Sequence, residues 1–291
     1  MMTSRIPAFP PHLDEDILSL QKRVAEQNIL PYFKNLKELD IDTKSSATDF
    51  VTIADQQAER HLISGLKHLL PEARFVAEEN TAQFGLSEAL DTGFVWTIDP
   101  LDGTRNFVKG DTQFCTMLGL LYDGMPVGAW IYKPLTSECV MTRHDALPCY
   151  IDAQGSTRTC QQINPKTYQK NANYSASDSI HNLRGCMNAM GFDNTIRDRV
   201  RKKLKTLKGR FHIGSAGVEA LSIAAGSCDY LMHSKLTYWD SVPVVMVLNS
   251  LGYHVRLAPS GALYQPGDKG VLLAAPTANI WQLLADFIWS S

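Results

Sequence analysis

The sequence predicts a mixed fold, with an α+β first half followed by an α/β second half. Up to about residue 156, two helical segments precede strand patterns joined by hairpin turns, which favours antiparallel pairing. From residue 157 onward, helical and strand segments alternate, which is typical of an α/β arrangement. We therefore predict two halves, residues 1–156 and 157–291, and 291 residues suffice for a large core.

Each element of the first half has a local signal. Apolar residues at helical spacing follow Asp14, a candidate cap, and Pro71 ends a second helical pattern. The pair Asp123-Gly124 marks a hairpin turn. In chain order we predict helices over 14–33 and 56–70, strands over 74–77 and 94–98, a hairpin over 114–141 and a strand over 149–151.

The second half alternates, and its breaks fall at glycine and proline. Gly226 follows a helical pattern, and Pro243 falls near a helix start, where proline is tolerated. In chain order we predict a strand over 173–176, helices over 180–190 and 197–208, a strand over 210–213, a helix over 216–225, a strand over 229–232, a helix over 241–250, strands over 253–257 and 271–275, and a helix over 278–289.

The bulk composition is that of a globular enzyme in the cytoplasm. The net charge of −2 gives no field that favours nucleic acid or a membrane surface. No apolar run approaches the ~20 residues of a membrane span. The six cysteines form no C-x-x-C pair, which favours free thiols in a reducing compartment over a disulfide or zinc framework.

The run WTIDPLDGTRNF, residues 96–107, carries the strongest chemical signal. A strand pattern ends at Asp99, and Asp102 follows it by three residues. Gly103 permits a sharp turn, after which Thr104 can cap a helical turn. Hard divalent cations bind carboxylate oxygens, and phosphate binds N–H groups at a helix start. The run therefore predicts a metal and phosphate site.

This run resembles the first signature of the inositol monophosphatase family of magnesium-dependent phosphomonoesterases. Further segments resemble the family in the same order: DFVTIAD at 49–55 with Lys44 before it, VAEEN at 76–80, GSA at 214–216 and WD at 239–240. Five segments in one order are more specific than one short motif. The resemblance, over about residues 44–252, implies a layered α-β-α-β-α sandwich with the site between the halves.

The resemblance also implies a ligand set for two or three Mg²⁺ ions. Glu78, Asp99 and the Leu101 carbonyl would hold the first ion, and Asp99, Asp102 and Asp240 the second. A third ion would contact Glu78 largely through water. If these acids converge without a cation, their repulsion raises their pKa values, and divalent metal removes that difficulty.

For catalysis, the resemblance implies that Thr104, hydrogen-bonded toward Asp55, orients a metal-bound water near Glu78. The N–H groups of Gly103 and Thr104 would cradle the phosphate, and Lys44 would add an outer charge. Metal-activated water would then attack directly, releasing phosphate and an alcohol. Asp55 and Asp240 also suit simple helix caps.

The substrate pocket departs from the family. Asp102, Ala216 and Asp240 match its substrate contacts, but His233 stands where inositol phosphatases carry glutamate. Imidazole can bind a hydroxyl or, when charged, an anion, and it can equally be structural. After Asp240 the family's small residues are also replaced, by Val242-Pro243 and Leu251-Gly252-Tyr253.

Several substrates and roles stay open. Histidinol phosphate, fructose 1,6-bisphosphate and a nucleotide 3′-phosphate are alternatives to a polyol phosphate. The basic run 197–205 has an apolar face, which favours a solvated amphipathic helix over RNA binding or a second substrate phosphate. A non-enzymatic role in RNA or transcription machinery is the alternative of another class. An aspartyl-phosphate mechanism fits poorly, since D-x-x-D-x-T is one residue longer than D-x-D-x-T. The resemblance further implies a homodimer and lithium sensitivity.

Overall fold

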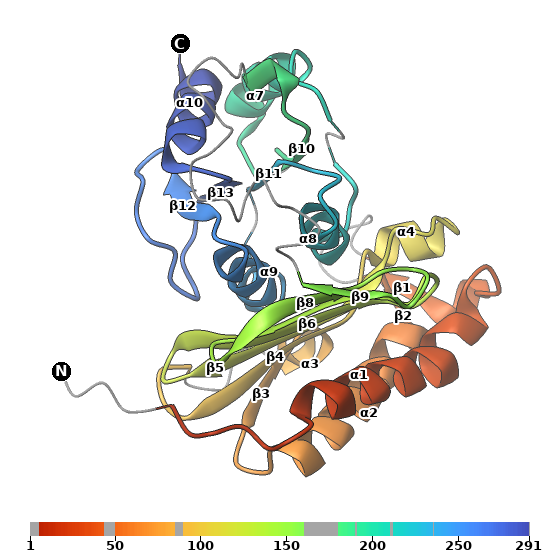
Figure 1. The fold of residues 1–291 in the computed structure, drawn as a ribbon. Coiled ribbons are helices and arrows are strands. Elements are labelled where there is room, and N and C mark those ends of the chain that lie inside the picture. The colour runs from red at the N-terminus through yellow and green to blue at the C-terminus, as the bar shows by residue number, and fades with distance from the viewer. Residues whose placement is uncertain are drawn as a thin grey trace.

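The computed structural model describes residues 6–43, 50–84, 90–159, 180–189, 191–209, 212–234 and 236–290. The elements stack as helices, a large sheet, helices, a smaller sheet and helices (Figure 1). This arrangement confirms the predicted α-β-α-β-α sandwich. The division into domains at residue 157 stays a prediction, although the large sheet extends to Thr159.

The first helical layer contains α1 (Leu13–Val24) and α2 (Ile53–Leu69). A π-helical turn (Ala25–Ile29) and 3₁₀ turns (Leu30–Tyr32, Glu38–Asp40) follow α1, and β1 (Ile41–Thr43) pairs with β2 (Phe50–Thr52). Asp14 is not the predicted cap. It lies inside α1, where its carboxylate accepts a hydrogen bond from Trp130 at 2.8 Å and pairs with Arg143.

Within the described residues, the large sheet has seven strands in chain order. They are β3 (Arg74–Ala77), β4 (Phe94–Asp102), β5 (Cys115–Tyr122), β6 (Met125–Lys133), β7 (Glu138–Arg143), β8 (Ala146–Ile151) and β9 (Thr157–Thr159). Strand β3 runs parallel to β4, and every later pair is antiparallel. Asp123 and Gly124 form the predicted hairpin turn, both with positive φ. Short helices α3 (Glu78–Phe84) and α4 (Thr104–Val108) follow β3 and β4.

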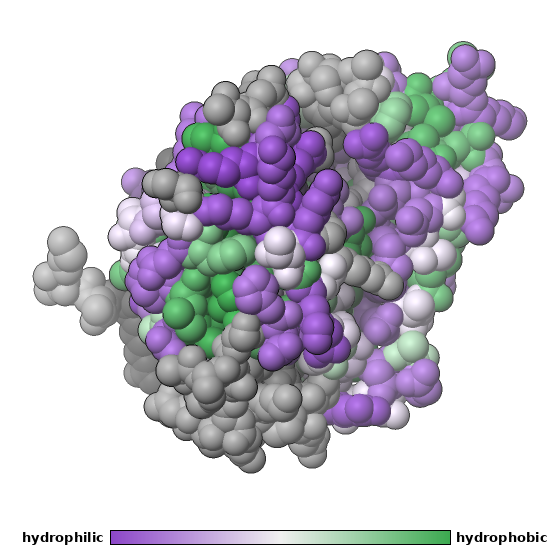
Figure 2. Space-filling view, turned by 90° about the horizontal axis from the view of Figure 1, so that it is seen from above, coloured by the Kyte–Doolittle hydropathy of each residue, from purple (hydrophilic) through white to green (hydrophobic). Residues whose placement is uncertain are grey.

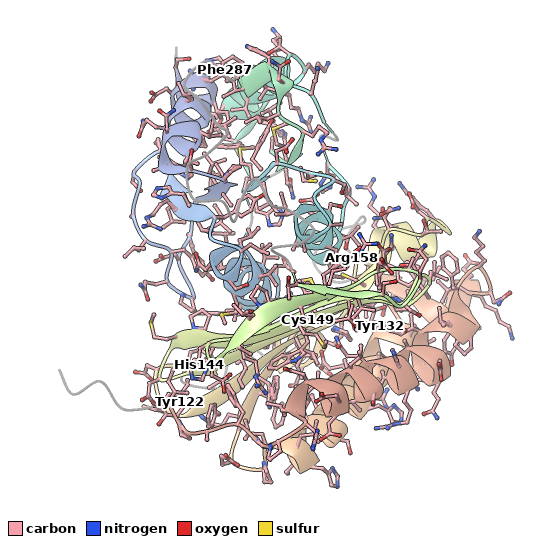
Figure 3. The ribbon with its side chains drawn as sticks, viewed as in Figure 1. Tyr122, Tyr132, His144, Cys149, Arg158 and Phe287 are labelled. Atoms are coloured by element: carbon pink, nitrogen blue, oxygen red, sulfur yellow. The ribbon has the colours of Figure 1, made fainter. Side chains whose placement is uncertain are left out.

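The smaller sheet, as far as the chain is described, has the order β10-β11-β13-β12. Its strands are β10 (Gly185–Asn188), β11 (Tyr230–His233), β12 (His254–Ala258) and β13 (Val271–Ala275). The outer helices are α7 (Asn194–Leu204) and α10 (Ala278–Trp289), and a 3₁₀ turn (Ile180–Asn182) precedes β10. Phe287 of α10 and Tyr132 of β6 therefore lie in layers far apart (Figure 3).

Between the sheets lie α8 (Ala216–Ala224) and α9 (Tyr238–Ser250). Their apolar side chains form one core with both sheets, for example Val218, Val244 and Leu248 against Met117 and Leu272. Helix α9 is buried along most of its length, which fits its nearly uniform apolar sequence. Two further cores lie beneath α1 and α2 and beneath α7 and α10.

Some predicted elements of the second half are wrong. The helix predicted over 180–190 is a 3₁₀ turn and then β10, because Cys186 and Met187 are buried in parallel pairing with β11. Such pairing between distant segments overrides local propensity. Of the strand predicted over 210–213, the described residues 212 and 213 are not in a strand. The strand predicted over 173–176 lies outside the described residues.

Three observations concern the described structure as a whole: its helix lengths, its cysteines and its surface. No helix in the described ranges is long and apolar enough to cross a membrane. Cys115, Cys139, Cys149, Cys186 and Cys228 are all free thiols. The face shown in Figure 2 is hydrophilic over much of its coloured area, and hydrophobic side chains gather in more than one place on it.

The close packing of α9 on β5 gives a test of the fold. A Cβ atom at Gly119 would lie 2.5 Å from Thr97 Oγ1 and 2.8 Å from a Val242 methyl. We expect Gly119→Ala to lower the free energy of unfolding by roughly 1–3 kcal/mol, measured by urea denaturation. Leu147→Ala, on an exposed position of the same sheet, is the control and should change it by less than about 0.5 kcal/mol. Equal effects would contradict this packing.

Candidate functional site

Asp99 and Asp102 lie at the end of β4, which continues past the predicted strand end at Ile98. Asp99 pairs with Met117 and Asp102 with Cys115, so β4 has one extra residue between these pairs. In a regular strand, residues three apart point to opposite faces. The bulge corrects this alternation and brings the two carboxylates together.

Asp240 reaches the same point from α9. The helix begins at Tyr238 with Thr237 as its cap, so the alternative of Asp240 as cap is wrong. Thr237 has extended backbone, and its Oγ1 accepts a hydrogen bond from the Asp240 N–H at 3.3 Å. Asp240 therefore lies in the first turn of α9, where its carboxylate reaches the end of β4. Oxygens of Asp99, Asp102 and Asp240 all lie within 4.8 Å of one another.

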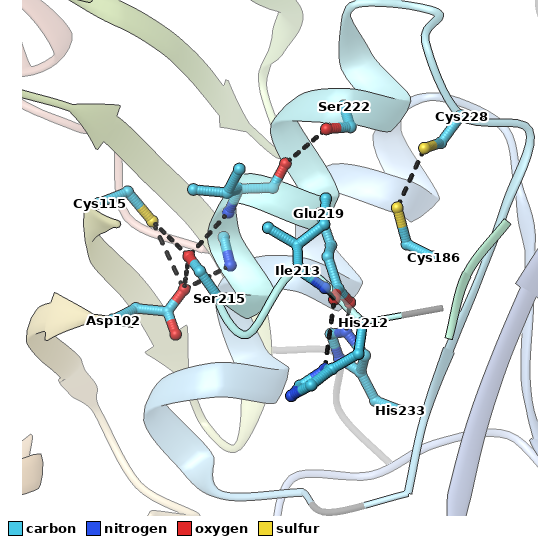
Figure 4. A network of polar contacts seen from close by, with 12 residues as sticks. Asp102, Cys115, Cys186, His212, Ile213, Ser215, Glu219, Ser222, Cys228 and His233 are labelled. Atoms are coloured by element: carbon cyan, nitrogen blue, oxygen red, sulfur yellow. Dashed lines mark hydrogen bonds and ion pairs between the residues drawn. The ribbon is translucent and has the colours of Figure 1, made fainter. Parts of the chain in front are cut away.

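Asp102 is fixed by donors from the start of α8. Its Oδ2 accepts hydrogen bonds from Ser215 Oγ at 2.6 Å and from the Gly217 N–H at 2.7 Å. Cys115 Sγ lies 3.5 Å from the same oxygen (Figure 4). Ser215 also caps α8. The carboxylate thus lies at the positive end of a helix, where negative charge is stabilised.

The charge at this point is nevertheless high. The pKa of Asp102 is raised to about 7, first by burial and then by the negative charge of Asp240, against the hydrogen bonds from Ser215, Gly217 and Ala216. Three crowded carboxylates are the donor set that hard divalent cations prefer, and a cation would relieve their repulsion. The geometry therefore fits a divalent metal.

Asp55 and Thr104 meet beside the acids. Asp55 belongs to a capping box of α2, in which its Oδ2 accepts from the Thr52 N–H at 2.7 Å and hydroxyl at 2.6 Å. Thr52 is thus the cap, and the alternative of Asp55 as the cap residue is wrong. Thr104 Oγ1 lies 3.0 Å from Asp55 Oδ1 and 3.0 Å from the Leu101 carbonyl oxygen. A hydroxyl has one proton, so it donates to only one of them at a time.

Glu78 is the first residue of α3, directly after β3. Since Ala77 pairs with Ile98, Glu78 lies at the end of the sheet where Asp99 emerges. Its carboxylate is not in the group of three acids found within 4.8 Å among the described residues. The backbone beside it is held by buried Glu59, which accepts from the N–H groups of Glu79 at 2.7 Å and Asn80 at 2.8 Å.

Gly103 makes the turn between β4 and α4. Its φ of +92° lies in the left-handed region, and a Cβ atom there would lie 2.8 Å from the Gln113 carbonyl oxygen. Gly103 itself, and not Thr104 as predicted, is the residue before the helix. The first N–H groups of a helix have no partner within it. In α4 these N–H groups belong to the residues that follow Gly103, so they come directly after Asp102 in the chain.

The predicted substrate contacts Ala216 and His233 begin α8 and end β11. Ala216 follows Ser215 and begins α8. His233 Nε2 lies 2.6 Å from Glu219 Oε2, with both side chains almost fully buried (Figure 4). Burial lowers the pKa of His233, but the hydrogen bond and charge of Glu219 outweigh it and the net pKa is raised. The substrate roles of His233 and Ala216 stay predictions.

Sequence reasoning missed the residues that support the site. Glu59, Asn106 and Glu219 carry no motif signal, because each contacts a distant segment. Asn106 Nδ2 donates to the carbonyl oxygens of Gln113 at 2.7 Å and Ile213 at 2.9 Å, which ties α4 to the loop before α8. The predicted outer charge Lys44, and Asp49 of the upstream segment, lie outside the described residues.

Comparison with known proteins defines the class. The model of the Inositol monophosphatase family matches residues 13–288, so the chain belongs to this family. Membership supports a phosphatase that depends on a divalent metal.

Individual relatives agree with this assignment. The chain is 38% identical to an inositol monophosphatase of Mesembryanthemum crystallinum, covering 76% of this chain and 74% of the relative. It is 29% identical to Nus factor SuhB of Vibrio cholerae, and the match covers 90% of this chain and 91% of the relative. A solved IMPase/NADP phosphatase, complexed with Mg²⁺ and phosphate, has the same fold, with a TM-score of 0.73 at 18% identity. This match covers 94% of this chain and 95% of the solved one.

The raised pKa of Asp102 gives a stability prediction for the chelated protein. Its folded pKa of about 7 lies above the ordinary value of 3.8, so the folded state binds an extra proton between these pH values. Stability from this group is therefore highest at low pH and is lost as pH rises toward about 7. Raising the pH from about 5 to about 7.5 should cost the chelated protein roughly 1–3 kcal/mol relative to Asp102→Asn.

Urea unfolding at both pH values, with a chelator present, measures this difference. Asp91→Asn, which removes an exposed acid before β4, is the matched control and should follow the parent protein. Parallel pH curves for the parent and Asp102→Asn would show that Asp102 carries no raised pKa.

Proposed function

We propose that the protein hydrolyses a small phosphate monoester with Mg²⁺, releasing phosphate and an alcohol. One observation carries the proposal: Asp99 and Asp102 of the large sheet and Asp240 of α9 converge within 4.8 Å. The contact between Thr104 and Asp55 lies directly beside them. Carboxylates from separate segments, crowded at a helix start, suit metal-assisted phosphoryl transfer.

The resemblance to the family supplies the ligand set of this proposal. Glu78, Asp99 and the Leu101 carbonyl would hold one ion, and Asp99, Asp102 and Asp240 another, with a third near Glu78. When bound there, Mg²⁺ would lower the pKa of a coordinated water and neutralise charge on the phosphate. Two or three ions are part of the proposal.

The chain's own groups position the nucleophile and the phosphate. With its proton donated to Asp55, the Thr104 hydroxyl leaves the Leu101 carbonyl free and turns its lone pairs toward the attacking water. Glu78 would lie near the same water. The N–H groups of Gly103 and Thr104 would hold phosphate oxygens at the start of α4. The attack is direct, without an aspartyl-phosphate intermediate.

The substrate is a small polyol phosphate or a related ester. Asp102, Ala216, His233 and Asp240 would contact its hydroxyl groups. Histidinol phosphate, fructose 1,6-bisphosphate and a nucleotide 3′-phosphate are the alternatives within the same chemistry. The raised pKa of His233, caused by Glu219 against burial, favours a charged imidazole that suits an anionic or oxygen-rich substrate.

A second candidate function is a partner role without catalysis. The similarity to a protein named Nus factor SuhB favours it. The two functions are separable, because a variant that lacks the metal site would retain a partner role. We also propose that the protein is a homodimer, which light scattering of the purified protein would test. We further propose that it is located in the cytoplasm.

Phosphate release over a panel of esters, with and without Mg²⁺, tests the proposal. We expect activity only with the metal. Asp240→Asn should lower kcat/KM by about 100-fold or more, since it removes charge at the reacting centre. Thr104→Val should lower kcat by about 10- to 100-fold, whereas Thr104→Ser, which keeps the hydroxyl, should retain most activity.

Asp91→Asn is the control for the loss of one acid and should behave as the parent. Activity that persists in excess chelator would refute the proposal, as would trapping a phosphorylated aspartate.

We also expect inhibition by lithium, which would compete for the carboxylate site without supplying a divalent charge. Phosphate release measured during a LiCl titration should fall, and equal NaCl should leave it unchanged. Identical curves for the two salts would contradict this expectation.

A further inference from the structure

Two buried cysteines lie together outside the metal site. Cys186 of β10 and Cys228 of the loop between α8 and β11 have their Sγ atoms 3.0 Å apart (Figure 4). They are 42 positions apart in the chain. A disulfide bond joins sulfur atoms at about 2.05 Å, so an approach of roughly 1 Å would bring these two within bonding distance. No predicted ligand, substrate contact or motif includes either cysteine.

The backbone holds both cysteines in place. Strand β10 pairs in parallel with β11, which fixes Cys186 within the smaller sheet. Beside this pairing, the Arg184 N–H donates to Asp229 Oδ2 at 2.8 Å, and the Asp229 N–H donates to the Arg184 carbonyl oxygen at 2.7 Å. The Cys228 N–H donates to the Ser222 carbonyl oxygen of α8 at 3.1 Å. The loop is thus tied to β10 on one side and to α8 on the other, so the two sulfur atoms meet without a change of fold.

Cys228 is the more reactive member of the pair. The hydrogen bond from Cys186 lowers the pKa of the Cys228 thiol, and the charge of Arg184 adds to this effect against burial. Arg184 is held nearby, since its guanidinium donates to the Gly226 carbonyl oxygen at 2.8 Å. Burial instead raises the pKa of the described thiols Cys115, Cys139 and Cys149. Because the thiolate is the nucleophile, Cys228 is the sulfur that reacts first.

Access to the pair limits the size of the oxidant. Cys228 is 6% exposed and follows exposed Ser227, whereas Cys186 is fully buried. Solvent therefore reaches Cys228 first, with Cys186 behind it. Hydrogen peroxide is small enough to enter there, whereas a peptide disulfide is not. A reactive thiol with a second thiol in contact is the arrangement that lets a sulfenic acid condense to a disulfide.

We propose that Cys186 and Cys228 form a reversible disulfide bond, with hydrogen peroxide as the oxidant. The Cys228 thiolate attacks one peroxide oxygen, the O–O bond breaks, and the released hydroxide takes the proton that the thiol gave up, forming water. The Cys186 sulfur then attacks the sulfenic acid on Cys228, the S–O bond breaks, and the hydroxyl leaves with the Cys186 proton as a second water. The two sulfur atoms together lose two electrons, and the peroxide gains them.

The bond would tie β10 to the C-terminal end of α8. Helix α8 has nine residues, a length of about 13 Å. Ser215, which donates to Asp102, lies at its other end. Oxidation therefore acts away from the acids, and the inference does not depend on the proposed phosphatase function. A disulfide that closes a long loop stabilises a protein chiefly by restricting its unfolded chain. We expect the oxidised protein to be more stable than the reduced one.

Peptide mapping of the peroxide-treated protein tests the bond directly. Free thiols are blocked by alkylation in denaturant before digestion with trypsin. Trypsin cuts after lysine and arginine, which places Cys186 in peptide 185–197 and Cys228 in peptide 211–235, and neither contains another cysteine. We expect these two peptides to be joined after treatment and separate after dithiothreitol. A bond to any other cysteine would overturn the proposal, as would thiols that stay free in excess peroxide or a sulfinic acid on Cys228 beside a free Cys186.

Thermal unfolding measures the consequence. Oxidation should raise the Tm of the parent protein by about 5 °C or more, and dithiothreitol should reverse this shift. Cys186→Ala and Cys228→Ala should each remove both the shift and the joined peptides. Cys149→Ala, which removes the half-buried thiol of β8, is the matched control and should keep both.

Two results would contradict the stabilising role: joined peptides without a rise in Tm, and a rise in Tm that persists in Cys228→Ala. The peptide map of the parent protein needs no variant, so it decides whether the bond forms even if a buried substitution prevents folding.

Discussion

The hydrogen bonds to Asp102 hold the two halves of the molecule together where its acids meet. Asp102 ends a strand of the large sheet, whereas Ser215 and Gly217 begin α8 between the sheets. A hydrogen bond to a charged group contributes roughly 1.5–3 kcal/mol, which offsets part of the repulsion from Asp240. Without these donors, the Asp102 carboxylate would no longer be fixed against the start of α8, and the metal site would lose part of its geometry.

The backbone geometry of β4, β5 and α9 also helps to bring the acids together. Gly103 admits the tight turn after β4, and Gly119 lets α9 approach β5 closely enough for Asp240 to reach Asp99. Thr237 begins α9 at the register that places Asp240 in its first turn. Each of these is a backbone requirement, and each fixes a carboxylate on a rigid element, where it is held more firmly than on a loop.

Local signals predicted the parts of the fold that depend on neighbouring residues. The hairpin at Asp123-Gly124 and the helix over 278–289 agree with the structure because turn chemistry and helical spacing decide them. The acids at positions 99, 102 and 240 converge as the motif order indicated. The helix predicted over 180–190 failed, because pairing with β11, over 40 residues away in the chain, decides its state.

Supporting contacts were invisible for the same reason. Glu59 holds the start of α3 from within α2, and Glu219 holds both His233 and the Ile213 N–H from within α8. In the sequence each is one acid on a helix, where a solvated position is the usual outcome. Only the packing of the layers shows that both are buried and bonded. Sequence patterns therefore located the candidate ligands but not the groups that orient them.

The candidate metal ligands and the basic helix α7 occupy different layers of the sandwich. The carboxylates lie where the large sheet meets the middle helices, whereas a cavity lined by Arg201, Lys205 and His212 lies against α7 in the outer layer. Buried Glu219 lies between them, with Oε2 on His233 and Oε1 within 3.9 Å of His212. Because α7 supplies no metal ligand, its charged face can change without disturbing the acids.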